Sequence, residues 1–438
     1  MNTDVFTSTS LLPKRDVMVT WTIRPSVAFL RWYHSVAIAA SLIILFSNLP
    51  IYSYILLPEL LPKYFFFGLF ALLAPLLIVK FHTLRSYLLS PFCLWALLLI
   101  VLNVIHLSSF SADAATSAAP FINTQLNGRS DFILTRIQYV VFALLFGFAV
   151  YSCNRTSYLR VFVLLAIAIP IAIMVDFASP GLLYPIDTSG AVLGRAAAMF
   201  INPTTAAEAA LLVFIFACAV VSPKYRLFLF VLMAAGILVT FTRSAIIAMA
   251  FLWVAFVYKR ILPRSTILIS AILLVLGVMS FGAFEAYLGN RQDLGGAIEN
   301  VQARLNFFSS AELTDDSSLE RAAVIRAGWE VFLQNPVFGA GAGATQFWSL
   351  RASTHNQLLL MAVEYGLLGI VLWGWLAIIL WKGRFFEHRG LQLAIFFLYV
   401  FMSMFTHLML DSASYWLATF ALASLRRDGA GMRYREMA

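Results

Sequence analysis

The chain has 438 residues, of which 61% are hydrophobic and only 12% are charged. A soluble domain carries about 25% charged residues, so this chain has too few charges to cover the surface of a soluble globule of its length. Apolar runs of about 20 residues recur, the length that a helix needs to cross about 30 Å of hydrocarbon. These continuous runs are also unlike the weak alternating segments of a membrane β-barrel. The composition predicts an all-α polytopic membrane protein.

The apolar runs predict about twelve transmembrane helices. They lie near 32–50, 64–80, 86–108, 132–152, 157–177, 198–222, 226–241, 244–259, 266–284, 355–381, 391–409 and 411–425. This pattern divides the chain into an N-terminal transmembrane bundle over 1–284, a large loop over 285–354, and C-terminal helices with a tail over 355–438. The first 25 residues are polar and basic, so we expect no removable signal peptide.

The net charge of +9 is distributed unevenly over the predicted loops. Most of the 30 Lys and Arg residues fall in the N-terminal segment, the C-terminal tail and every second loop between spans. Cytoplasmic loops of membrane proteins carry such an excess. We therefore expect both termini in the cytoplasm and the 285–354 loop on the outer face, and we interpret the charge as a sign of orientation and not of nucleic-acid binding.

The large outer loop contains a predicted helix of its own. Ser317 and Glu320 form a capping box, and apolar residues then recur at helical spacing from Ala322 to Leu333. Pro336 follows, which a helix tolerates poorly. The pattern predicts an amphipathic helix near 318–334, lying over the membrane surface or the bundle.

Three polar residues at the outer ends of predicted spans are candidates for function. Arg195 precedes the sixth span, Arg243 lies between the seventh and eighth, and His355 opens the tenth, four residues after Arg351. The arginine fork matches phosphate geometry, and histidine suits general-base chemistry at neutral pH. Such a set would serve a diphosphate anchored at the outer leaflet and a hydroxyl nucleophile arriving from outside.

Each of these residues also has a purely structural interpretation. A single arginine at the end of a span is commonly an interfacial anchor, and a lone histidine at a helix start is commonly a satisfied polar residue. Arg321 and Arg326 fit a solvated face of the loop helix. Glu208 and Glu364 lie about ten residues inside their predicted spans, where an unpaired carboxylate is costly. We expect each to pair with an arginine or a backbone donor and to support the site.

Three further motifs carry weaker signals. The run from Gly339 to Ala344 resembles a dinucleotide-binding loop only superficially, because no βαβ unit surrounds it. Asp315 and Asp316 lack the further carboxylates of a cation site, so we expect neither a metal nor a cofactor. Asp411 and His407 are close in sequence and form a weak candidate for a second polar pair.

Four stretches, together covering about residues 190–370, resemble the O-antigen ligase and polymerase superfamily of bacterial surface-polysaccharide enzymes. In chain order they are Gly194 and Arg195 with Phe200 to Pro203, Thr242 to Ala245, Ser318 to Arg321 with Asn335 to Gly341, and His355 to Leu358 with Glu364 to Gly369. Each motif is loose by itself, but their order and the large loop before the histidine are typical of the family.

The resemblance implies a GT-C-like membrane glycosyltransferase of the Gram-negative inner membrane, with its active site facing the periplasm. The donor would be an undecaprenyl-diphosphate-linked O-antigen and the acceptor a sugar hydroxyl of the lipid A–core oligosaccharide, both presented among membrane lipids. By this resemblance His355 would be the general base, and Arg195 and Arg243 would bind the diphosphate. Arg321, Arg326 and Arg351 would be supporting residues, the reaction would invert the anomeric configuration, and no metal would be required.

Other activities stay open. A polymerase would join repeat units, and a protein O-oligosaccharyltransferase would glycosylate a serine or threonine. The latter often has more soluble mass after the histidine than is present here, and the arginine–histidine set favours the ligase. A lipid or solute transporter is the alternative from another class. Transporters place polar residues near the midplane within paired repeats, whereas only Glu208 and Glu364 fit that pattern here.

Overall fold

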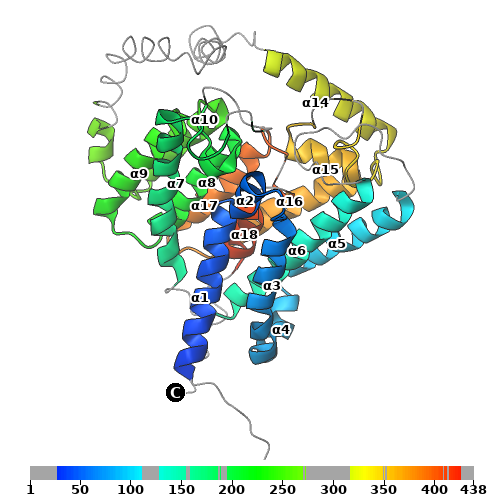
Figure 1. Cartoon of the computed structure of the whole chain (residues 1–438), viewed down its shortest axis with the longest axis horizontal. Helices are drawn as coiled ribbons and strands as arrows, with labels where there is room; N and C mark the ends of the chain where they lie inside the picture. The colour runs from blue at the N-terminus through cyan, green and yellow to red at the C-terminus, as the bar shows by residue number, and fades with distance from the viewer. Residues whose placement is uncertain are drawn as a thin grey trace, which may run out of the picture.

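The structure is a computed structural model. It describes residues 27–110, 128–153, 158–185, 188, 195–269, 272, 316–348, 350, 353–407, 409–411 and 414–425. Within these ranges the chain is helical and contains no β-strand (Figure 1). The N-terminal helices are α1 (Val27–Phe46), α2 (Leu49–Leu56), α3 (Pro62–Val79), α4 (Phe81–Leu88), α5 (Pro91–Phe110), α6 (Arg129–Tyr151), η1 (Tyr158–Arg160) and α7 (Val161–Ala178). They are followed by η2 (Ala198–Phe200), α8 (Pro203–Cys218), α9 (Pro223–Leu238), α10 (Arg243–Tyr258), α14 (Asp316–Gln334), α15 (Gln357–Tyr365), α16 (Leu367–Lys382), α17 (Arg389–Met402) and α18 (Ser414–Ala423).

Five described segments are long and apolar enough to cross a membrane. They are Ala28–Phe46, Pro62–Val79, Pro91–Ser108, Arg129–Tyr151 and Tyr158–Ala178. Five shorter apolar helices accompany them, namely Pro203–Cys218, Arg243–Tyr258, Leu367–Lys382, Arg389–Met402 and Ser414–Ala423. The prediction of an all-α polytopic membrane protein is confirmed, whereas the count of twelve spans and the GT-C-like arrangement stay predictions.

The predicted tenth span, 355–381, is wrong as a single helix. Helix α15 ends at Gly366, whose φ of 64° and ψ of −144° interrupt the helix, and α16 begins at Leu367. This backbone region is open almost only to glycine. The nine residues of α15 extend only about 13 Å, so Glu364 ends a short helix and does not lie deep inside a span. The first predicted span, 32–50, corresponds to α1 up to Phe46, and only its last two residues belong to α2.

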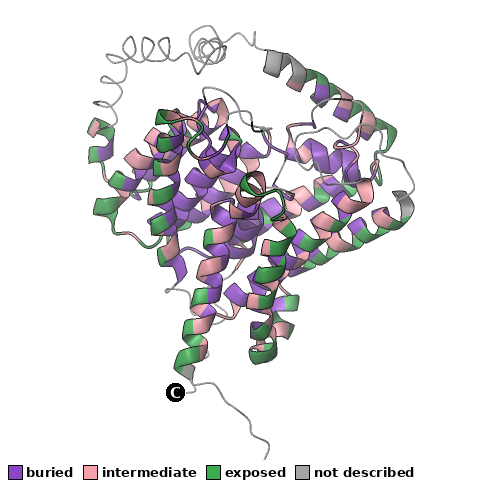
Figure 2. Cartoon of the chain, in the orientation of Figure 1, coloured by how far each residue is buried: buried purple, intermediate pink, exposed green. Residues whose placement is uncertain are grey.

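Two helices form the centre of the bundle. The described side chains of α18 are all buried, as are those of α8 beyond its first turn, and Figure 2 shows buried residues concentrated in this region with exposed residues on the outer helices. Glu208 of α8 accepts hydrogen bonds from Trp416 Nε1 at 2.7 Å and Tyr415 Oη at 3.1 Å, both on α18. These two donors satisfy Oε2 of the carboxylate, whereas its buried Oε1 has no hydrogen-bond partner among the described residues.

The predicted amphipathic helix near 318–334 is confirmed as α14. Val324 and Phe332 are buried on its inner side, where Phe332 packs against Leu359 and Val363 of α15. In Figure 1 this helix lies across one end of the molecule, beside α15. The remainder of the predicted loop up to residue 315, most of the ninth span and the first 26 residues lie outside the described residues.

Candidate functional site

Helices α10 and α17 run antiparallel. Ile261, just beyond α10, lies against Gly390 at the start of α17, and the Phe251 ring of α10 contacts the rings of Phe397 and Phe401 farther along α17. The first residue of α10, Arg243, therefore lies at the same end of the bundle as the C-terminus of α17. We call this the site end, defined by the N-terminus of α10 and the C-terminus of α17.

Arg195 is tied to the turn that precedes Arg243. Its Nε donates to the carbonyl oxygen of Thr240 at 2.9 Å, and its Nη2 donates to Thr242 Oγ1 at 2.9 Å. Thr242 is the N-cap residue of α10, which begins at Arg243. The structure thus brings together Arg195 and the turn that leads to Arg243, two of the three residues singled out in the sequence.

Asp176 fixes the segment that follows Arg195. Its Oδ2 accepts hydrogen bonds from the backbone nitrogens of Ala197 at 2.8 Å and Ala198 at 2.9 Å, and from Tyr184 Oη at 3.3 Å. Ala198 has a φ of 48°, a conformation that costs a non-glycine residue energy. The buried carboxylate stabilises this turn, and the turn presents Arg195.

His355 lies in a short segment packed against the connection from α17 to α18. Its φ is 49°, again in the left-handed region. The next residue, Asn356, caps α15 by accepting from Leu359 N at 2.9 Å, and Gln357 N donates to Ser403 O at 2.7 Å. Met409 N in turn donates to Gln357 Oε1 at 3.2 Å. These bonds place His355 at the site end, since Ser403 directly follows α17.

His355 is partly buried and has two basic neighbours. The rings of His355 and His407 meet edge to face, with centroids 4.8 Å apart. Burial, and next the positive charge of Arg321 on α14, lower the pKa of His355 to about 4. The imidazole is therefore neutral at neutral pH, with a lone pair available for a proton.

The glycine-rich run after α14 is a packing element. A Cβ at Gly339 would collide with the backbone of Glu364 and Tyr365, and a Cβ at Gly366 would collide with the backbone of Val337. Hydrogen bonds join the same two segments, from Ala340 N to Val363 O and from Leu367 N to Pro336 O. Glycine is needed at these positions because the backbone after α14 contacts the backbone at the end of α15. This packing role agrees with the expectation that the run from Gly339 to Ala344 is not a dinucleotide-binding loop.

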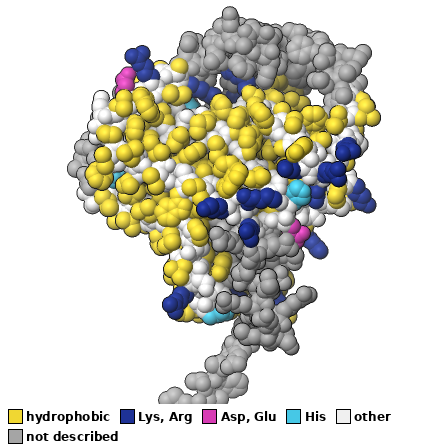
Figure 3. All heavy atoms as spheres, turned by 180° about the vertical axis from the view of Figure 1, so that it is seen from behind, with side chains coloured by type: hydrophobic (Ala, Val, Ile, Leu, Met, Phe, Trp, Pro, Cys, Tyr) yellow, Lys and Arg dark blue, Asp and Glu magenta, His cyan; other side chains and the backbone are white. Residues whose placement is uncertain are grey.

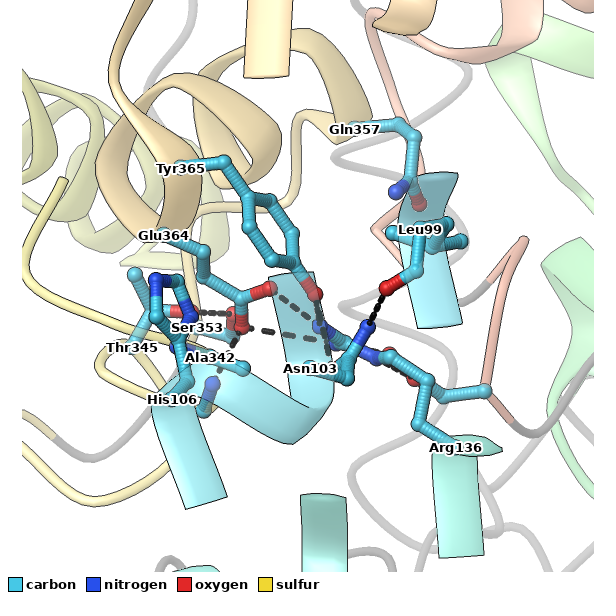
Figure 4. Close-up of polar contacts among 12 residues, drawn as sticks. Leu99, Asn103, His106, Arg136, Ala342, Thr345, Ser353, Gln357, Glu364 and Tyr365 are labelled. Carbon is cyan, nitrogen blue, oxygen red and sulfur yellow. Dashed lines mark hydrogen bonds and ion pairs between the residues drawn. The ribbon is translucent and has the colours of Figure 1, made fainter. Parts of the chain in front are cut away.

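A buried polar network lies beneath α15. Arg136 of α6 donates to the carboxylate of Glu364 and, at 2.9 Å, to Tyr365 Oη. It also donates from Nε and Nη2 to the two carboxylate oxygens of Asp411, at 2.6 and 3.0 Å. Tyr365 Oη donates to Asn103 Oδ1 at 3.0 Å. Figure 4 shows Asn103, Arg136, Glu364 and Tyr365 converging on this network from three helices.

The remaining predicted residues have varied surroundings. Glu364 pairs with an arginine and with the backbone nitrogen of Gly343 at 2.7 Å, as expected, whereas the partners of Glu208 are the two ring donors of α18. Arg326 is exposed and pairs with Glu330 on its own helix, and Arg351 lies outside the described residues. The suggested Asp411–His407 pair is wrong, because Asp411 bonds to Arg136 and His407 contacts His355.

Sequence reasoning missed Arg136, Asp176 and the contact of His407 with His355. Arg136 was detectable, since a charged residue inside an apolar span is by default a candidate for function. Among the described residues, no group of three or more His, Cys, Asp or Glu side chains is placed to hold a metal ion. The expectation of a metal-free reaction stays a prediction.

The apolar helices and this polar end define a multi-pass membrane protein with a candidate active site where α8, α10, α15 and α17 meet the connecting segments. Residues 228–374 match the family model described as O-antigen ligase. This match over about a third of the chain supports the O-antigen ligase and polymerase superfamily, whose members are glycosyltransferase-like ligases and polymerases. The match includes Arg243, Arg321, His355 and Glu364 and begins after Arg195 and Glu208. A comparison with curated proteins finds no match.

Proposed function

We propose that the protein transfers an O-antigen polysaccharide from undecaprenyl diphosphate to a sugar hydroxyl of the lipid A–core oligosaccharide, at the periplasmic face of the bacterial inner membrane. The match of residues 228–374 to the O-antigen ligase family model supports the class of reaction. The observation that carries the proposal is the position of Arg243 and of a neutral His355 at one end of the bundle. A phosphate-binding side chain and a base are what transfer from a diphosphate to a hydroxyl requires.

In the proposed reaction His355 takes the proton of the acceptor hydroxyl. The acceptor oxygen attacks the anomeric carbon of the donor, and the bond from that carbon to the diphosphate oxygen breaks with its electron pair. Undecaprenyl diphosphate leaves with the additional negative charge. A single displacement of this kind inverts the anomeric configuration, and it needs no cofactor because the diphosphate is already an activated leaving group.

The arginines have complementary roles in this proposal. Arg243 binds the diphosphate and stabilises the charge that develops on its oxygen as the bond breaks. Arg195 holds the turn before Arg243 through Thr240 and Thr242 and adds positive charge at the same place. Arg321 disfavours the protonated form of His355, which keeps the base available before the acceptor arrives.

The proposed orientation follows from charge at the other end of the bundle. Arg226 donates to Ile261 O at 3.0 Å, and Arg389 donates to Gly383 O at 3.0 Å, so both lie opposite the site end. Figure 3 shows a broad apolar surface, with Lys and Arg side chains in its lower half and others at its upper end. Basic residues such as Arg226 and Arg389 at the end opposite the site favour the cytoplasm for that end, which supports a periplasmic site and cytoplasmic termini.

The decisive experiment supplies the purified protein with a lipid-linked glycan and two acceptors, lipid A–core and the lipid-linked repeat unit, in the presence of a chelator. We expect glycan on lipid A–core with inverted anomeric configuration. Extension of the repeat unit instead would identify a polymerase. If neither acceptor is glycosylated while the glycan lipid crosses a vesicle membrane, the protein is a transporter. Loss of transfer in chelator would contradict the metal-independent mechanism.

A further inference from the structure

Arg136 is the most heavily bonded buried charge among the described residues. It lies in the first half of α6 and its side chain is 1% exposed. One guanidinium group donates to Glu364, Asp411 and Tyr365, and its cation lies over the ring of Phe132 with 4.7 Å to the ring centroid. The proposed chemistry makes no use of this group.

The two carboxylates that Arg136 bonds belong to the two segments that carry the histidines. Glu364 is near the end of α15, whose start follows His355 by two residues. Asp411 follows His407 by four residues in the connection between α17 and α18. Arg136 thus joins the same two segments whose histidine rings contact each other.

The position of Glu364 relative to Asp411 depends on the guanidinium group of Arg136. Nε and Nη2 donate to the two oxygens of Asp411, and Nη1 donates to Glu364 and Tyr365. Nη2 also donates to the second oxygen of Glu364 at 3.4 Å. A guanidinium presents five donors in a rigid plane, whereas an ammonium group presents three donors from one atom on a flexible stem. Lysine would keep the charge but could not hold both carboxylates in this relative position.

We propose that Arg136 is a positioning residue for glycan transfer: it fixes the His355 segment against the His407 segment and thereby sets where the base meets the acceptor hydroxyl. This inference rests on the proposed function. Arg136 touches no reacting atom and acts through Glu364 and Asp411. The alternative is that the buried ion pairs only hold the fold together, in which case their loss would affect stability without a specific effect on the base.

The test compares Arg136→Lys and Asp411→Asn with the wild-type full chain, purified in lipid nanodiscs. Misplacing a catalytic group by about 1 Å can cost about 100-fold in rate. We expect kcat to fall about 10- to 100-fold in both variants, with KM for the lipid-linked glycan changed less than about twofold because the diphosphate site is untouched. We also expect the acid limb of kcat/KM to move to higher pH, because a loosened contact admits water to His355.

The matched control is Gln392→Leu. Gln392 is buried in α17 and donates to Leu380 O at 2.7 Å and Ala423 O at 3.0 Å, so it also joins three helices. It lies roughly 16 Å along the helix from Ser403, away from the site end. We expect this variant to lose thermal stability while keeping the wild-type kcat and pH profile.

Several outcomes would overturn the inference. If the folded Arg136→Lys protein keeps the wild-type kcat and pH profile, Arg136 has no positioning role. The same conclusion follows if Gln392→Leu loses as much kcat as Arg136→Lys at an equal loss of thermal stability. If Arg136→Lys does not fold, Asp411→Asn alone decides by the same criteria, and Glu364→Gln takes its place if it also fails to fold. If the wild-type protein transfers glycan to neither acceptor, the proposed function itself fails, which is a distinct result.

Discussion

The imidazole rings of His355 and His407 meet edge to face, with an angle of 84° between their planes and 4.8 Å between their centroids. His407 is buried, while His355 is partly accessible. His355 is therefore the ring that an acceptor hydroxyl can reach, and the buried ring of His407 packs against it. The left-handed backbone at His355 is retained because the surrounding bonds to Ser403 and Met409 determine its position.

Replacing His355 with alanine should abolish glycan attachment without preventing insertion or folding. A general base contributes about 100- to 10,000-fold to the rate, and removal of a partly exposed ring costs little packing. The measurement is the lipopolysaccharide ladder of a null strain complemented with the variant, together with the amount of protein in the membrane. The control is His82→Ala, an exposed histidine of α4. A normal ladder with His355→Ala would rule out this residue as the base.

The pH dependence of transfer should reflect the low pKa of His355. The imidazole accepts a proton from the acceptor only in its neutral form, and its pKa in the folded protein is about 4, below the usual 6.5. The acid limb of kcat/KM, which reports the free enzyme, should therefore lie near pH 4 and not near pH 6.5. A pH–rate profile from pH 4 to 8 checks this, and a limb centred at 6.5 would contradict it.

Arg321→Gln should move that acid limb to higher pH. The positive charge of Arg321 lowers the pKa of His355, so its removal makes protonation easier and raises this pKa. The pH midpoint of the acid limb is determined relative to the variant's own maximal kcat/KM. A shift of the midpoint is thereby distinguished from a loss of maximal rate. Arg326→Gln is the control, because Arg326 is exposed and paired with Glu330 on the same helix. An unchanged limb in Arg321→Gln would remove Arg321 from the electrostatics of the base.

Substitution of Gly366 should destabilise the protein, unlike substitution of Gly374 eight residues later. Alanine at Gly366 would occupy a backbone region that costs about 1–3 kcal/mol, and its Cβ would collide with the backbone of Val337. A Cβ at Gly374 meets nothing within 4 Å. We expect a lower Tm in detergent and reduced transfer for Gly366→Ala, and wild-type values for Gly374→Ala. Equal Tm values would show that the contact between the two backbones is dispensable.

The apolar runs predicted most helices of the bundle because lipid exposure requires a long apolar sequence. Helices α6, α7, α9 and α10 begin and end within a few residues of their predicted bounds. The break at Gly366 was not predictable in this way, because Leu367 and Leu368 continue the apolar run beyond it. The composition of a segment indicates whether it lies in lipid or in water. A helix break at one residue with positive φ does not change that composition, so the composition does not predict the break.

The candidate site was predictable only in part, because its residues contact partners that are far away in the sequence. Arg195, Arg243 and His355 were found because polar residues at the ends of spans are costly and few. Their partners were not found, since Arg136 and Asp411 are 275 residues apart in the chain and nothing local relates them. The pairing of Glu364 was expected from its burial, but the identity of its arginine required the three-dimensional arrangement of α6 and α15.

Arg243→Lys should impair turnover although it keeps the charge. The guanidinium fork can donate two parallel hydrogen bonds to a phosphate, whereas an ammonium group acts as a point charge. Loss of one charge-assisted bond costs about 1.5–3 kcal/mol, which corresponds to about 10- to 150-fold in kcat/KM. The control is Arg264→Lys, an exposed arginine just beyond α10, at the other end of that helix. Steady-state transfer with lipid-linked glycan measures both variants, and full activity of Arg243→Lys would exclude Arg243 from the diphosphate site.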